Sequence, residues 1–405
     1  MIGVASAHPT SIVQYYPVYI NNTQTSATPA PFQQMITANL STMSNIIYAS
    51  DGSFSNMEFY YPSNNSIIPS WIESNSSGNL TIWLNISAGI AASTNETVDM
   101  GLSNSTTNML NNSTNGEAPQ LSSTYAEYDD GASVFPNYWN FAGTTLPTSL
   151  STDISGGTIT VNNSVSFSQS ATTDYTLIQT TSTIIEPQVV DAYIPSQSSG
   201  TGFRIYESLT NNVGESSGTY GWGWQGGTQY LLYGGSGLAS EAVASFPTDV
   251  WSFVWSATGS QSGSLAYGST LSTSNTSATI ANYYLVIGLF YDVGSGTVNM
   301  QWLRTRAYPP SGVMPSVTFG SVQESYTPPT VSISPTSQTL DIPQSITLTA
   351  TVSGGTTPYT YQLLHSSNRC LMLGLLNMCL MLRRLWQYLN CTCLMFLYTT
   401  DSCMM

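Results

Sequence analysis

The stretch Val250-Trp-Ser-Phe-Val-Trp255 shows the pattern that decides the fold. Successive side chains of a β-strand point to opposite faces, so Trp251, Phe253 and Trp255 share one face, which we expect to be the buried face of a sheet. Short runs of this kind recur along the chain between Gly, Asn, Pro and Ser, and no long stretch shows the 3.6-residue apolar period of a helix. The sequence therefore predicts an almost entirely β-structured protein.

The candidate strands form two groups. The first group covers residues 15–20, 57–61, 80–84 and 98–102. The second group covers residues 157–161, 184–185, 188–194, 202–206, 250–255, 283–291 and 298–305. A long series of strands without helices favours a two-sheet sandwich for the second group.

Charged residues are scarce. Of the 405 residues only 7% are charged, against about 25% in an ordinary soluble protein. The net charge is −15 at pH 7, and lysine is absent. This balance argues against nucleic acid as a partner, because phosphate binding needs clustered Lys and Arg, and it argues against docking on an anionic membrane. A surface of Ser, Thr and Asn varies little with pH, so the composition is compatible with an acidic habitat.

The cysteines all lie between Cys370 and Cys403, so disulfides play no part in the body of the chain. From about residue 363 the chain becomes rich in Leu, Met and Cys. Its apolar run, residues 370–382, is 13 residues long and is short of the about 20 that span a membrane. We therefore expect no membrane insertion in residues 1–362. We interpret residues 363–405 as an aberrant tail, such as a shifted reading frame would produce.

Two features indicate an extracellular or cell-surface protein. Ala5-Ser-Ala7 has the small-x-small pattern of a signal-peptidase site, so residues 1–9 are interpreted as the remnant of a signal peptide, with an ordinary N-terminal segment as the alternative. Sequons for N-glycosylation crowd into the region before residue 113. The candidate asparagines are Asn64, Asn75, Asn79, Asn85, Asn95, Asn104 and Asn111.

Several motifs resemble known surface modules. Pro69-Ser-Trp-Ile-Glu73 and Thr81-Ile-Trp83 resemble a domain of unknown function found in large bacterial and archaeal surface proteins, often just before a concanavalin-like jelly roll. The blocks at 126–131, 138–143 and 301–308 resemble a concanavalin or laminin-G-like sandwich, with Gln301 where that family often has Asp. Residues 331–362 resemble the opening strands of an immunoglobulin-like repeat, with Leu363 where Trp is usual.

The resemblances imply an all-β fold class: a small β-sandwich followed by a concanavalin-like jelly roll and a truncated immunoglobulin-like domain. The expected boundaries are 10–119 for the first β-domain, 120–325 for the jelly roll and 331–362 for the partial immunoglobulin-like domain. Residues 326–330 join the last two, and their Pro-Pro pair favours a semi-rigid extended linker.

An aromatic hairpin is the most suggestive candidate for ligand binding. With Gly226-Gly227 as a two-residue turn, Tyr220, Trp222 and Trp224 share one face with Tyr233. Flat aromatic rings stack on sugars, so an exposed strip of these residues would suit a glycan groove. The alternative is that the strip forms half of the sandwich core, which the usual burial of Trp favours. In that register Tyr230 and Leu232 cover the glycines on the other face.

The sequence shows no catalytic residues. Glycosidases need two carboxylates about 5–10 Å apart, and the nearest approach to such a pair is Glu127-Tyr-Asp129-Asp130. We interpret it as a solvated loop start or a weak calcium ligand. The two histidines, His8 and His365, lie near the ends of the chain, which argues against histidine-based triads and zinc sites.

These features favour a non-enzymatic surface or secreted protein, of the adhesin or lectin kind, that binds carbohydrate or another surface component. The alternative is a structural cell-envelope or stalk protein without a discrete ligand. A polysaccharide-degrading enzyme is a third, remote alternative. We expect no cofactor, although the dispersed carboxylates leave room for a structural calcium.

Overall fold

The computed structural model divides the chain into two compact units, Tyr15–Val322 and a unit made of Met1–Gln14 with Gln323–Met405. The described residues are 9, 11–39, 43, 54–76, 79–185, 188–198, 202–208, 220–233, 236–243, 248–255, 260–265, 267, 270–274, 282–290, 295–324, 330–336, 346–353, 360–365 and 393–398. Nearly all regular structure among them is β, as predicted. None of their helices has the length and apolar character needed to cross a bilayer.

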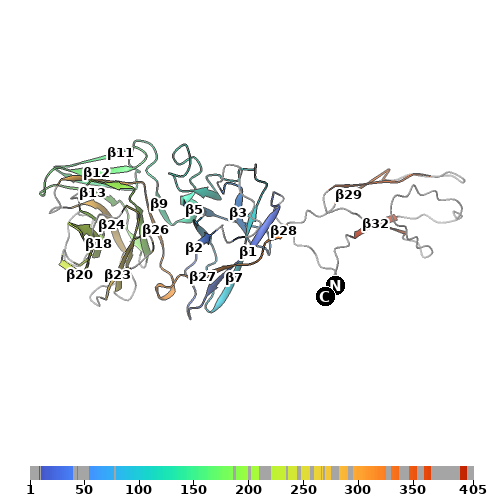
Figure 1. Cartoon of the computed structure of the whole chain (residues 1–405), viewed down its shortest axis with the longest axis horizontal. Coiled ribbons are helices and arrows are strands. Elements are labelled where there is room, and N and C mark those ends of the chain that lie inside the picture. The colour runs from blue at the N-terminus through green and yellow to red at the C-terminus, as the bar shows by residue number, and fades with distance from the viewer. Residues whose placement is uncertain are drawn as a thin grey trace. The chain divides into compact units, whose positions relative to one another are not determined.

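The first sandwich is built from two sheets (Figure 1). One sheet has the order β27-β1-β7-β3-β4, with β1 (Gln14–Asn22), β3 (Met57–Tyr60), β4 (Ile67–Ile68), β7 (Thr94–Leu102) and β27 (Ser316–Phe319). The other has the order β2-β6-β5-β8, with β2 (Phe32–Asn39), β5 (Ser70–Ser76), β6 (Asn79–Ile86) and β8 (Asn115–Glu117). Alternating apolar side chains of both sheets, including Val18, Phe59, Ile82 and Met100, meet in one buried core.

Strand β27 joins this sandwich from a distant part of the sequence. It pairs antiparallel with β1, Val18 opposite Phe319 and Asn21 opposite Ser316. The sequence-based boundary placed residues 316–319 with the jelly roll, whereas the structure places them in the first sheet. The jelly roll is therefore inserted between strands of the first sandwich, and both of its ends are tied to that sandwich.

The jelly roll has two large sheets and one small one. The first has the order β10-β13-β24-β17-β18-β19-β20, formed by β10 (Leu150–Ser155), β13 (Tyr175–Thr180), β24 (Asn282–Leu289), β17 (Phe203–Ser208), β18 (Tyr220–Gln225), β19 (Thr228–Tyr233) and β20 (Ser236–Ala242), with β14 (Ile184–Ile185) against β24. The second has the order β23-β22-β21-β15-β26-β9, formed by β23 (Thr270–Ser274), β22 (Ser260–Leu265), β21 (Val250–Trp255), β15 (Gln188–Tyr193), β26 (Trp302–Ala307) and β9 (Asn137–Trp139).

The small sheet has the order β11-β12-β25-β16, with β11 (Thr158–Val161), β12 (Val165–Gln169), β25 (Gly296–Met300) and β16 (Ser196–Gln197). The short helix α1 (Gly131–Val134) precedes β9, and a 3₁₀ turn covers Pro310–Gly312. The core between the sheets contains Trp222, Trp251, Phe253 and Ile287. The predicted inward face of residues 250–255 is confirmed for Trp251 and Phe253, which are both buried.

One predicted strand was wrong in its continuity. Residues 298–305 were expected to form a single strand, but the chain leaves the small sheet after Met300 and enters the second large sheet at Trp302. Gln301 lies between them and donates its backbone N–H to the carbonyl of Tyr193. Alternation of apolar residues continues across the break, so the change of sheet leaves no signal in the hydrophobic pattern.

The other unit is described only in part. It contains β28 (Gln323–Glu324), the antiparallel pair β29 (Thr330–Ser334) and β30 (Thr349–Ser353), and the antiparallel pair β31 (Thr360–His365) and β32 (Cys393–Tyr398). The immunoglobulin-like interpretation of residues 331–362 stays a prediction. The linker 326–330 is outside the described residues except Thr330, and so is most of the tail after residue 365.

Candidate functional site: a buried ion-pair network

Strand β26 is buried on both faces. Leu303 packs in the jelly-roll core, while Trp302, Arg304 and Arg306 alternate onto the opposite face. That face packs against strands β5 and β6 of the first sandwich. Trp71 of β5, Trp83 of β6 and Trp302 of β26 belong to one buried cluster at this contact. We call this contact between the two sandwiches the seam.

Glu73 reaches the seam because of a β-bulge. In the β5–β6 pair Ile72 stands opposite Ile82, but Ser74 stands opposite Thr81, so Glu73 is the extra residue. A bulge of this kind re-aims a side chain without breaking the sheet. Glu73 is 4% exposed and would be costly to bury without partners.

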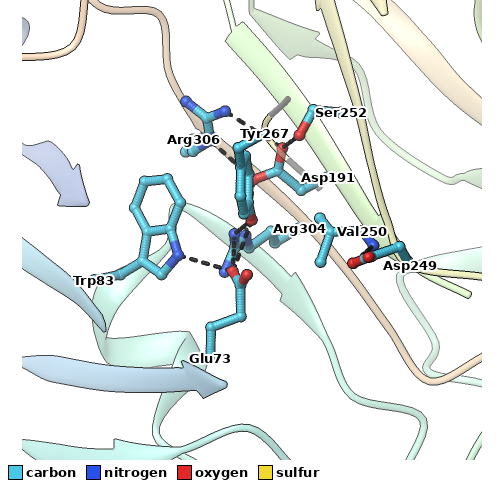
Figure 2. A network of polar contacts seen from close by, with 9 residues as sticks. All are labelled: Glu73, Trp83, Asp191, Asp249, Val250, Ser252, Tyr267, Arg304 and Arg306. Carbon is cyan, nitrogen blue, oxygen red and sulfur yellow. Dashed lines mark hydrogen bonds and ion pairs between the residues drawn. The ribbon is translucent and has the colours of Figure 1, made fainter. Parts of the chain in front are cut away.

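Arg304 supplies those partners. Its Nη2 donates to Glu73 Oε2 at 2.6 Å, and its Nε donates to Asp191 Oδ2 at 2.9 Å (Figure 2). Glu73 Oε2 also accepts from Trp83 Nε1 at 2.8 Å and from the Tyr267 hydroxyl at 2.7 Å. The Tyr267 oxygen in turn accepts from Arg304 Nη2 at 2.6 Å. A single carboxylate oxygen of the first sandwich is therefore held by three donors, two of which come from the jelly roll.

Asp191 of β15 is the second carboxylate of the network. Its Oδ2 accepts from Arg306 Nε at 2.8 Å as well as from Arg304, and its Oδ1 accepts from Ser252 Oγ at 2.6 Å. Asp191 and Arg304 are both fully buried. Two carboxylates thus face two guanidinium groups, and the charges of the network balance.

Aromatic rings surround the Arg304 guanidinium. Its Cζ lies 4.3 Å from the ring centre of Phe135, 4.6 Å from Trp83, 4.7 Å from Trp302 and 5.1 Å from Trp71. Ring faces attract a desolvated cation, so they compensate part of the hydration that Arg304 loses. Trp71 and Trp83 come from the first sandwich and Phe135 and Trp302 from the jelly roll, so both sandwiches contribute rings around Arg304.

Protonation follows from these contacts. Burial disfavours the charged form of Asp191, but the guanidinium groups of Arg306 and Arg304 outweigh it and lower the pKa of that carboxyl. Burial likewise opposes the charge on Arg304, but Tyr267, Glu73 and Asp191 raise its pKa. Both groups are therefore ionised over the whole range from mildly acidic to basic pH.

Asp129 forms a second polar centre at the seam. It accepts from Trp71 Nε1 at 2.9 Å, from the Tyr138 hydroxyl at 2.9 Å and from Asn140 Nδ2 at 2.7 Å. Asp130 beside it is 2% exposed. The expectation of a solvated loop start is therefore wrong for these two residues, because Asp129 contacts Trp71, Tyr138 and Asn140 and Asp130 packs against Gly116. Of the three acids only Glu127 is exposed. Asp129 and Asp130 follow a turn and do not lie on a strand face.

The predicted register of the aromatic hairpin is confirmed. Tyr220 stands opposite Tyr233, Trp222 opposite Leu231 and Gln225 opposite Thr228, so Gly226-Gly227 is the turn. Both turn glycines have positive φ, which a side chain would disfavour. Tyr220, Trp222 and Trp224 are buried in the jelly-roll core, with Tyr233 half-buried against it. The carbohydrate-binding role of these four residues stays an untested prediction, and their placement is that of the core alternative.

The opposite face of the same hairpin carries a different set of groups. Arg204 of β17 is half-buried, stands between Gly223 of β18 and Gly288 of β24, and lies 5.3 Å from the ring centre of Phe290. Its Nη2 donates to Gln225 Oε1 at 3.3 Å. Tyr230 stands opposite Gly223 and is also half-buried. We call this the outer face of β17–β19.

The candidate glycosylation sites differ in exposure. Five of the asparagines are exposed: Asn64, Asn75, Asn79, Asn95 and Asn104. Asn85 is half-buried and donates its amide to the Ser133 carbonyl at 2.9 Å. Asn111 is half-buried as well, and its Oδ1 accepts from the backbone of Ser113. The last two amides are engaged in the fold.

The network around Arg304 was missed by sequence reasoning. Its residues come from positions 73, 83, 191, 252, 267, 304 and 306, and no spacing rule links them. The one available signal was that two of the few arginines alternate along a strand of otherwise uncharged residues. Among the described residues no group of three or more His, Cys, Asp or Glu comes together as metal ligands would.

Comparison with known proteins gives one relative in sequence. No family model matches the chain. Uncharacterized protein 562 of Sulfolobus islandicus rod-shaped virus 1 is 29% identical over 340 residues, covering 75% of this chain and 58% of that protein. The chain therefore spans little more than half the length of this relative.

Solved structures with similar chain traces include both enzymes and lectins. The endo-β-1,3-glucanase from Pyrococcus furiosus is 11% identical, with a TM-score of 0.33, over 43% of this chain and 94% of its own. The Lotus tetragonolobus seed lectin is 5% identical, with a TM-score of 0.33, over 44% and 96%. The legume lectin-like domain from Entamoeba histolytica is 12% identical, with a TM-score of 0.31, over 38% and 89%. These similarities do not separate a catalytic from a binding function.

Proposed function

We propose that this chain is a non-enzymatic surface or secreted protein whose unit Tyr15–Val322 binds carbohydrate or another surface component. The observation that carries the proposal is the network around Arg304, which ties the jelly roll to the first sandwich by buried ion pairs. A binding face on such a body is preorganised, so little conformational freedom is lost when a ligand binds.

The same network supports a non-catalytic role. Glycoside hydrolysis needs one accessible carboxylic acid that can give up a proton and a second carboxylate beside the scissile bond. Glu73 and Asp191 both contact Arg304, are buried, and accept hydrogen bonds from neighbouring side chains. A buried carboxylate that contacts a guanidinium group is not accessible to a bound polysaccharide and cannot act as its general acid.

The outer face of β17–β19 is the surface we favour for the ligand. It combines the planar guanidinium of Arg204, the amide of Gln225 and the phenol of Tyr230. Planar groups with polar edges suit sugars, which offer C–H faces for stacking and hydroxyls for hydrogen bonds. On the opposite face of the same strands, Tyr220, Trp222 and Trp224 pack in the jelly-roll core and hold the strands in place.

A glycan array with three forms of the protein tests the proposal. We expect wild-type protein to bind a defined glycan class. The double change Arg204→Ala with Tyr230→Ala should weaken that binding at least about tenfold while the melting transition is kept. Tyr19→Ala, which removes an exposed tyrosine from β1, is the matched control and should bind like wild type. Unchanged binding by the double variant would move the site to another face, and release of sugars from a polysaccharide screen would overturn the non-enzymatic assignment.

A structural role without a discrete ligand is the second candidate. The burial of Trp222 and Trp224 favours it, because the most aromatic hairpin of the chain is used to fill the core. Absence of binding across the array, with a cooperative melting transition, would select this alternative.

An extracellular location belongs to the same proposal. Asn64, Asn75, Asn79, Asn95 and Asn104 are the sites that we propose for glycans, because their side chains are exposed. Mass spectrometry of protein from its native source should find glycans at several of these positions and none at Asn85. Unmodified peptides at all five positions would remove this support.

A further inference from the structure

Two sets of acids in the Tyr15–Val322 unit differ in their surroundings. Glu73 and Asp191 contact arginines at the seam. Glu58, Asp99 and Asp130 instead have no basic group among the described residues in contact with them. The chain has no lysine, and the described arginines Arg204, Arg304 and Arg306 contact other groups.

Glu58 and Asp99 lie on one face of the first sheet. Strands β3 and β7 pair with Tyr60 opposite Asp99 and Glu58 opposite Gly101, so the two acids share the face that points away from the sandwich core. Asp99 is 3% exposed and Glu58 is half-buried. The titratable groups that face them are Tyr60 on β3 and Tyr15 on the neighbouring strand β1. This face therefore holds two acids among phenols.

Asp130 is buried in a tighter place. Neither of its carboxyl oxygens has a hydrogen-bond partner in the described part of the chain. Its Oδ1 packs against Gly116 of β8, where a Cβ would come within 2.2 Å of it. The nearest charged group is the carboxylate of Asp129, which already accepts hydrogen bonds from Trp71, Tyr138 and Asn140. A second negative charge here would be neither hydrated nor compensated.

We propose that this fold carries a built-in response to pH, in which Glu58, Asp99 and Asp130 are neutral acids in an acidic medium and their ionisation near neutrality weakens the first sandwich and its junction with the jelly roll. The uncharged surface predicts little variation with pH. The change of charge with pH instead comes from these three groups, which lie within the fold.

The direction of the effect follows from the pKa values. Burial raises the pKa of Glu58 to about 7 and of Asp99 to about 6. Burial and the neighbouring Asp129 raise the pKa of Asp130 to about 8. A carboxyl whose pKa is higher in the folded than in the unfolded state binds its proton more tightly when folded, so stability is lost as pH rises from about 4 through these values. The lowered pKa of Asp191 acts oppositely, and its contribution is lost only below about pH 4.

Thermal unfolding of the full chain between pH 4.5 and 8.5 tests the proposal. We expect the Tm of wild type to fall across pH 5–8, with the unfolding constant rising about tenfold for each unit of pKa difference. The variant with Glu58→Gln, Asp99→Asn and Asp130→Asn should lose most of this fall, because amides resemble the neutral acids. Glu324→Gln changes an exposed acid and should leave the fall unchanged.

A second measurement covers the case in which the triple variant does not fold. Calorimetry of wild type at pH 6, in buffers of different ionisation enthalpy, should show protons released on unfolding, because the folded state binds more of them. Proton uptake at pH 6, a wild-type Tm that is flat or rising over pH 5–8, or an undiminished fall in a folded triple variant would each overturn the proposal.

Discussion

The two outward faces of the first sandwich treat buried carboxylates in opposite ways. On the seam, Glu73 meets Arg304, two indole or phenol donors and a set of aromatic rings. On the face of the other sheet, Glu58 and Asp99 lie beside tyrosines. At the seam, the guanidinium groups of Arg306 and Arg304 lower the pKa of Asp191, whereas burial without a cation raises the pKa of Glu58 and Asp99. The comparison teaches that the pH dependence of folding stability is determined by the groups that the tertiary structure places next to each acid, and only weakly by the number of acids in the chain.

The largest loss of stability is expected when the Arg304 guanidinium is removed from the seam, because this leaves Glu73 without its cation, like Glu58 and Asp99 on the other face. Arg304→Met should lower the free energy of unfolding by about 3–5 kcal/mol at pH 7, because Glu73 and Asp191 would remain buried with part of their compensation lost. Urea denaturation measures the loss. Arg204→Met, the same change on a half-buried side chain, should cost much less. Adding Glu73→Gln and Asp191→Asn to Arg304→Met should recover part of the stability, and failure to do so would contradict the charge-based explanation.

A smaller loss is expected when one donor to the seam is removed. Trp83→Phe keeps an aromatic ring near Arg304 but removes the Nε1–H that donates to Glu73 at 2.8 Å. Hydrogen bonds to charged groups contribute about 1.5–3 kcal/mol, and we expect a loss in this range by urea denaturation. Trp222→Phe is the control, because its Nε1 donates to the neutral Gln229 at 3.3 Å. Equal losses in the two variants would show that ring volume, and not the carboxylate bond, determines the effect.

The smallest effect should come from the edge of the network. Ser252→Ala removes the shorter of two hydrogen bonds to Asp191 Oδ1 and leaves the one from Arg306 Nη2 at 3.5 Å, and both arginines still contact Oδ2 of the same carboxylate. We expect a loss at the lower end of the same range, about 1.5 kcal/mol, since one hydrogen bond to a charged group is lost while both guanidinium groups still compensate its charge. Chemical denaturation at pH 7 measures it, and a loss as large as that of Arg304→Met would contradict the ranking.

Much of the local structure could be predicted from the sequence. The alternation in residues 250–255 identified Trp251 and Phe253 as core residues, and Gly226-Gly227 identified the hairpin register, because both signals depend on neighbours along the chain. The break at Gln301 could not be predicted in this way. Both sides of it are β-strand, and only the choice of sheet changes.

The candidate site was beyond the reach of sequence patterns for the same physical reason. Period-two alternation determined which side chains leave each strand on a common face, including Trp302, Arg304 and Arg306. It did not determine what lies opposite that face. The return of β27 to β1 pairs Val18 with Phe319, which are hundreds of positions apart. The bulge at Glu73 is local to the β5–β6 pair, but the residue that its side chain meets, Arg304, is 231 positions away. The sequence by itself determined an all-β chain with an uncharged surface; the tertiary structure decided which of its few charges are paired, because pairing is a property of contacts in space.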